Sequence, residues 1–98
     1  MAWSEDETVW GEDEYVAYLR DERRRFAWVM QRYEGLTSAE AEKAALERYP
    51  YEASDTPFRG LIFHDEAWHW AMLRIYNDRY HVDRPELAQP SAEYEALD

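Results

Sequence analysis

The sequence predicts an all-α protein: a small three-helix bundle with short acidic helical or irregular segments at its ends. Three observations indicate this class. Apolar residues recur three and four positions apart over long stretches, which is the spacing of one helix face. Only three Gly and four Pro interrupt the 98 residues. Hydrophobic residues make up 46% and aromatic residues 16%, enough apolar surface for one packed domain over residues 1–98.

The first predicted helix runs from about residue 12 to residue 34. Its apolar positions share one face: Tyr15, Leu19, Phe26, Val29, Met30 and Tyr33. Gly35 is placed to end the helix, because glycine takes the left-handed conformation without steric cost. On the solvated side, Asp21 and Arg25 are four residues apart, so we expect them to pair.

The second predicted helix covers residues 37–49. Thr37 and Glu40 have the spacing of a capping box, in which each side chain accepts a hydrogen bond from the other residue's amide. Several alanines favour the helix, and Pro50 ends it by excluding the preceding residue from helical geometry. Two residues are expected to provide most of its packing, Leu46 and Tyr49.

The third predicted helix covers residues 63–80 and follows a connector over residues 51–58. Apolar residues in "AWHWAMLRIY" cover nearly the whole helix circumference. A helix that is apolar all round is buried, so we expect Trp68 and Met72 to form the spine of the bundle. His69 is expected to be a core histidine whose ring finds a hydrogen-bond partner.

The formal net charge of −11 is concentrated at the ends of the chain. Residues 1–14 contain six acidic residues and residues 85–98 contain four, and neither segment contains a basic one. Residues 15–84 contain twelve acidic residues and all eleven basic ones. We therefore divide the domain into an acidic aromatic arm (1–11), a helical body (12–84) and an acidic tail (85–98).

This composition excludes several classes of partner and site. Acidic ends repel nucleic acids and anionic membranes, so direct binding to either is not expected. No run approaches the roughly 18 apolar residues of a membrane span, and the first residues do not form a secretion signal. The absence of cysteine excludes disulfides and thiolate metal sites. We expect a cytoplasmic protein.

The two ends also carry large apolar residues. Trp3 and Trp10 are seven residues apart, so both rings lie on one side if the arm is helical. The arm then packs on the chain's own arginine cluster, presents its rings and carboxylates to a basic groove on another protein, or extends into solvent. The tail either crosses the bundle, held by Leu87, Tyr94 and Leu97, or is a flexible extension.

These features predict a non-catalytic interaction module that binds a basic protein partner. Inhibition of that partner is one version of this prediction. Immunity proteins, antitoxins and mimics of nucleic-acid charge combine acidic charge with a compact body in this way. Charge speeds encounter, and aromatic rings supply contact area. The predicted partner-binding residues are Trp3, Glu5, Asp6, Glu7, Trp10, Glu12, Asp13 and Glu14. We predict no catalytic residue and no cofactor.

One alternative function centres on Glu66 and His69. They are three residues apart, the E-x-x-H step that carboxylate-bridged di-iron bundles use in pairs. Only one such step is present, so a complete site requires dimerisation. The alternative is therefore a dimeric carboxylate–histidine metal or acid–base site. The apolar third helix is also compatible with a homodimer seam.

Overall fold

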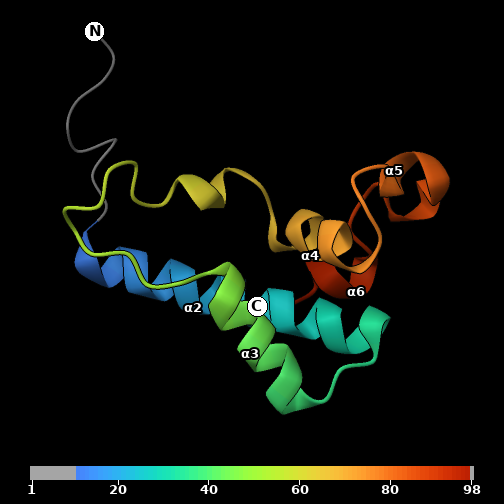
Figure 1. The fold of residues 1–98 in the computed structure, drawn as a ribbon, viewed down its shortest axis with the longest axis horizontal. Helices are drawn as coiled ribbons and strands as arrows, with labels where there is room; N and C mark the ends of the chain where they lie inside the picture. Colours follow the sequence, from blue (N-terminus) through green and yellow to red (C-terminus); the bar gives the residue numbers. More distant parts are fainter. Residues whose placement is uncertain (1–10, 98) are drawn as a thin grey trace, which may run out of the picture.

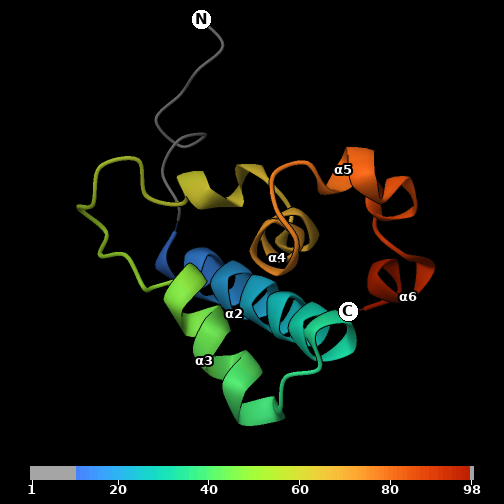
Figure 2. The same cartoon turned by 45° about the vertical axis from the view of Figure 1, so that its right-hand side comes forward.

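The computed structural model describes residues 11–97 (Figure 1). These residues form helices, turns and loops and contain no strand, which confirms the all-α prediction. The α-helices are α2 (Glu12–Val29), α3 (Ser38–Arg48), α4 (Ala67–Ile75), α5 (Tyr80–Asp83) and α6 (Ala92–Glu95). Helix α2 runs through the middle of the molecule and packs against both α3 and α4, which lie on different sides of it (Figure 2).

The first helix has the predicted extent but changes its hydrogen-bond pattern near its end. After α2, Met30–Glu34 forms a π-helical turn. Gly35 then ends the helix in the left-handed conformation, with φ of 76°, as predicted. The ring of Tyr33 in this turn lies edge-on to Trp68 of α4, with the ring centroids 5.4 Å apart.

Helix α3 begins as predicted and ends within a residue of the predicted position. The Thr37 hydroxyl accepts from the Glu40 amide at 3.2 Å, and the Glu40 carboxylate accepts from the Thr37 amide at 2.9 Å. Tyr49 is fully buried, as predicted, with its ring 5.9 Å from that of Phe26. Leu46 is 46% exposed, so the prediction that it packs in the core is wrong. The buried surface of α3 consists instead of Ala41, Ala44 and Ala45.

The predicted third helix is divided, so the prediction of one continuous helix is wrong. The chain forms a 3-10 turn at Leu61–His64, then α4, and then α5. Asp65 and Glu66 are extended, with ψ of 153° and 156°. After Tyr76, the Asn77 side chain accepts a hydrogen bond from the Arg79 amide at 2.8 Å. Such a bond to the backbone two residues on competes with helix formation.

Helix α4 places one tryptophan in the core. Trp68 is 2% exposed and its Nε1 donates to the Leu87 carbonyl at 2.9 Å, and Met72 is fully buried. The side chain of His69 is 37% exposed, and its Nδ1 lies 2.9 Å from the Tyr80 hydroxyl. The prediction that His69 is a core histidine is therefore wrong, because its ring is half-buried at the surface.

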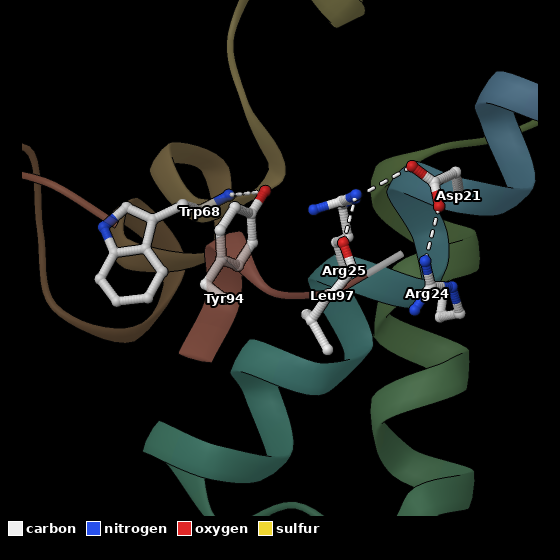
Figure 3. Close-up of polar contacts among 6 residues, drawn as sticks. All are labelled: Asp21, Arg24, Arg25, Trp68, Tyr94 and Leu97. Carbon is white, nitrogen blue, oxygen red and sulfur yellow. Dashed lines mark hydrogen bonds and ion pairs between the residues drawn. The ribbon is translucent and has the colours of Figure 1, made fainter. Parts of the chain in front are cut away.

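The C-terminal segment packs across the body through the residues predicted for that role. Leu87 and Tyr94 are buried, and Leu97 is half-buried against the core. Arg25 of α2 donates to the Leu97 carbonyl at 2.7 Å (Figure 3). The same guanidinium pairs with Asp21 at 2.9 Å, which confirms the pairing predicted from their spacing.

Side chains from two other helices hold the N-terminus of α4. The amide of Ala67 donates to the Glu22 carboxylate of α2, whose residue is only 7% exposed. The amide of Trp68 donates to the Tyr94 hydroxyl of α6 at 3.3 Å (Figure 3). The first amides of a helix have no partner within it, so these contacts fix α4 on α2 and α6. Burial, together with nearby Asp21, raises the pKa of Glu22.

We expect Glu22→Gln to raise the free energy of unfolding at neutral pH, because the neutral amide oxygen still accepts from Ala67. A raised pKa means that the folded state holds the proton more tightly than the unfolded state. Ionisation of Glu22 therefore lowers wild-type stability as the pH rises from the ordinary value of 4.5 through the folded-state pKa. Urea unfolding as a function of pH measures the effect, and the advantage of the variant should disappear below pH 4.5.

The matched control is Glu42→Gln on the exposed surface of α3, which should leave the pH profile close to that of the wild type. A Glu22→Gln variant that is less stable than the wild type at neutral pH would show that the ionised carboxylate is required at the junction.

Candidate functional site

The first turn of α2 is the part of the predicted partner-binding segment that the structure describes. We call residues 12–14 the acidic turn, and all three of its side chains are exposed. The Glu14 carboxylate accepts a hydrogen bond from the Gly11 amide at 3.2 Å. Negative charge here is favourable because it faces the positive end of the helix dipole. The other predicted residues lie outside the described part: Trp3, Glu5, Asp6, Glu7 and Trp10.

Glu12 is already engaged within the molecule. Its Oε2 accepts from the Tyr51 hydroxyl at 2.6 Å, and its Oε1 pairs with Arg59 at 2.7 Å. The hydrogen bonds from Tyr51 and Arg59 lower the pKa of Glu12. Asp13, one residue further on, is exposed and makes no hydrogen bond or ion pair within residues 11–97. The acidic turn therefore has one carboxylate that binds the body and others that face solvent.

The connector, which in the structure we take as residues 51–60, is fastened to the first two turns of α2. The Arg59 side chain is only 8% exposed, and its guanidinium carbon lies 3.8 Å from the Tyr15 ring centre and 5.8 Å from that of Tyr51. The Glu52 amide donates to the Tyr15 hydroxyl at 2.8 Å. These cation–π and hydrogen-bond contacts hold the connector beside the acidic turn.

A second candidate site surrounds His69. Its Nδ1 lies 2.9 Å from the Tyr80 hydroxyl, and its Nε2 lies 4.0 Å from Asp65 Oδ2. Glu66 is exposed at the start of α4 and lines, with these residues, a hollow of about 340 Å³. Burial raises the pKa of Tyr80, so the phenol stays protonated at neutral pH. The predicted pair of Glu66 and His69 thus shares a hollow, but the direct partners of His69 are Tyr80 and Asp65.

Sequence reasoning did not single out Tyr51, Arg59, Asp65 or Tyr80. The first two lie in the connector, where neither helical nor strand periodicity applies. The spacing of four residues between Asp65 and His69 is visible in the sequence. No sequence feature, however, predicted the extended backbone at Asp65. Tyr80 reaches His69 only because the predicted third helix is divided.

Within residues 11–97, no three His, Asp or Glu side chains gather in a group able to hold a metal ion. No helix of this part of the chain has the length and apolar character needed to cross a membrane. Comparison of the chain with protein-family models, curated proteins and solved structures finds no match. The dimeric site at Glu66 and His69 requires two chains and stays a prediction.

We expect Glu12→Gln to loosen the connector at neutral pH, because a neutral amide is a weaker acceptor for the Arg59 guanidinium. The lowered pKa of Glu12 means that its contribution to stability is present above the ordinary value of 4.5. That contribution is lost as the pH falls through the folded-state pKa. Amide hydrogen exchange measures the change at Glu52 and at Gly60, whose amide donates to the Glu52 carboxylate at 3.0 Å.

Asp13→Asn makes the same change of charge one residue away and should leave the exchange of both amides unaltered. Equal acceleration by the two variants would indicate a general charge effect and not a specific tie between Glu12 and the connector.

Proposed function

We propose that the protein is a non-catalytic interaction module whose acidic N-terminal region binds a basic surface on a partner protein. Binding would inhibit or neutralise that partner, in the manner of an immunity protein, an antitoxin or a mimic of nucleic-acid charge. The observation that carries the proposal is the separation of charge: six acidic residues and no basic residue in residues 1–14, against twelve acidic and eleven basic residues in residues 15–84. A cytoplasmic location belongs to the same proposal.

The ion pairs of the body support this assignment. Within residues 11–97, five arginines are paired with nearby acids: Arg24 and Arg25 with Asp21, Arg32 with Glu93, Arg59 with Glu12, and Arg74 with Glu47. In the N-terminal region, Glu12 is paired with Arg59, whereas Asp13 makes no ion pair within residues 11–97. Excess charge of one sign steers an oppositely charged partner and raises its rate of association.

The predicted contact residues take two roles in this proposal. Glu12 positions the acidic turn against the connector through Tyr51 and Arg59. The contacts with the partner come from the other members of the set: Trp3, Glu5, Asp6, Glu7, Trp10, Asp13 and Glu14. The tryptophans supply apolar area and the carboxylates supply charge, the combination found in tight interfaces between proteins.

We expect capture of the partner from an extract of the native host to be abolished when four acids are replaced by their amides: Glu5→Gln, Asp6→Asn, Glu7→Gln and Asp13→Asn. The captured protein, identified by mass spectrometry, should carry a basic surface, and its retention by the wild type should fall as salt is added. Circular dichroism should show unchanged helix content, because the helical body is intact.

The matched control neutralises four acids elsewhere, Glu40, Glu42, Glu47 and Glu86, and keeps the same net charge as the test variant. Capture should persist in the control. Loss in both variants would show that net charge alone decides binding, and retention in the test variant would place the interface elsewhere.

A second candidate function is the dimeric acid–base or metal site at Glu66 and His69. One observation favours it: His69 lies between the Tyr80 hydroxyl and the Asp65 carboxylate at the edge of the 340 Å³ hollow. An imidazole hydrogen-bonded to a phenol, with a carboxylate 4.0 Å away, is a set of groups suited to proton transfer. A second chain would supply the remaining ligands or the substrate-binding wall.

Elemental analysis of protein purified without chelator, with light scattering across concentration, separates the two candidates. If the interaction module is correct, we expect no stoichiometric metal. His69→Ala should then lower the free energy of unfolding by about 1 kcal/mol, through loss of the hydrogen bond to Tyr80. His81→Ala, at an exposed position two residues before Asp83, is the control. Stoichiometric metal in a dimer, lost in His69→Ala, would favour the second candidate.

A further inference from the structure

The connector displays large apolar side chains beside the acidic turn. Tyr51 is 53% exposed, Phe58 is 81% exposed and Leu61, directly after the connector, is 61% exposed. We call these three residues the connector patch. Phe58 and Leu61 are joined by a backbone hydrogen bond of 2.9 Å, and both views show the connector passing beside the start of α2 (Figures 1 and 2). Clustered exposed apolar residues mark interaction sites more often than isolated ones do.

The backbone at Phe58 is one that phenylalanine rarely adopts. The Arg59 amide donates to the Thr56 carbonyl at 3.2 Å, which closes a turn with Pro57 second and Phe58 third. Phe58 has φ of 56°. Proline followed by a residue with positive φ is the pattern of a type II turn, whose third position favours Gly or Asn. A bulky residue here is strained, and such strain gathers at functional sites.

Within residues 11–97, Phe58 gains little burial in return for this strain. Its ring is almost fully exposed, so it contributes little apolar burial to folding. Neither the preference of the backbone nor the packing of the core therefore accounts for phenylalanine at this position. A contact with another molecule does, because it would bury the ring that the turn holds outward.

The charge around the connector patch is negative. Glu12 of the acidic turn contacts Tyr51 and Arg59. Its neighbours Asp13 and Glu14 are exposed, as is Asp55 of the connector. Arg59 is the basic residue of the connector, and Glu12 neutralises it at 2.7 Å. An apolar centre with a charged rim is the usual anatomy of a protein interface. A rim of this sign complements a basic segment.

We propose that the connector patch is a docking surface for a basic segment of a partner protein. An apolar side chain of that segment packs on Phe58 and Leu61, and its Lys or Arg residues lie over the acidic turn. This inference rests on the proposed function and adds to it a contact on the helical body, outside residues 1–10. The pairing of Glu12 with Tyr51 and Arg59 holds the two parts of the surface in one arrangement.

The sign of the charge distinguishes this occupant from two others. A second copy of the chain would bring the same acidic rim against itself, which opposes association. The chain's own residues 1–10 contain three acidic residues and no basic residue, so they do not complement the rim either. A basic partner is the occupant whose charge matches the surface.

Two synthetic peptides of equal positive charge test the proposal by titration calorimetry on the full chain. One alternates lysine with leucine, and the other has serine in place of each leucine. Wild-type protein should bind the leucine peptide roughly tenfold more tightly than the serine peptide. Phe58→Asn should remove this difference, whereas Asp13→Asn combined with Glu14→Gln should weaken both peptides to the same degree.

Phe58→Asn is chosen because asparagine tolerates positive φ, so its melting temperature should equal or exceed that of the wild type. The matched control is Val82→Asn, at another large apolar residue, 56% exposed and located on α5. Val82→Asn should leave the preference for the leucine peptide unchanged.

Equal affinity of wild-type protein for the two peptides would overturn the inference and leave the proposed function intact, whereas failure to bind either peptide would count against both. An unchanged preference in Phe58→Asn would also overturn it. So would light scattering that shows a wild-type dimer dissociated by Phe58→Asn, because a second copy would then occupy the patch. Deletion of residues 1–10 gives a last test. If it shifts the amide signals of Phe58 and Leu61, the chain's own arm occupies the patch, and the inference is overturned.

Discussion

The buried carboxylate of Glu22 is the contact on which the arrangement of three helices depends. It lies on α2, away from solvent, and accepts a hydrogen bond from the Ala67 amide at the start of α4. The Tyr94 hydroxyl of α6 accepts a hydrogen bond from the next amide, that of Trp68. A carboxylate removed from water is costly unless its partners are in place, so these contacts specify one placement of α4. Trp68 then lies edge-on to both Tyr33 and Tyr94, and the core forms around it.

The same logic connects the body to the surface proposed for binding. Glu12 is the second carboxylate of α2 that reaches beyond its own helix, and it holds the connector by way of Tyr51 and Arg59. Because the connector is held before any partner arrives, little conformational entropy remains to be lost there on binding. The acidic turn and the connector patch are therefore held in one arrangement, in which charge guides the approach and exposed apolar side chains provide contact area.

The parts of the fold that local sequence specifies are the parts that could be predicted. The face of α2, the stop at Gly35 and the capping box of Thr37 each depend on residues within a few positions of one another. The break in the third helix could not be predicted, because Glu22 draws the start of α4 to Ala67 from far along the chain, and the Asn77 side chain competes with the backbone after it. The two connector contacts join residue pairs whose members are 39 and 47 positions apart in the sequence. The periodicity of apolar residues carries no information about contacts over such separations.

The left-handed Gly35 between the π-helical turn and α3 has a consequence for how this sequence can diverge. A Cβ atom added there meets no other atom within 4 Å, so crowding places no restriction on the position. Only the backbone angle opposes a side chain, and asparagine tolerates that angle best among the non-glycine residues. Natural selection is therefore free to exchange Gly35 for asparagine without rearranging the helical hairpin, whereas valine or isoleucine would be strained at this backbone angle.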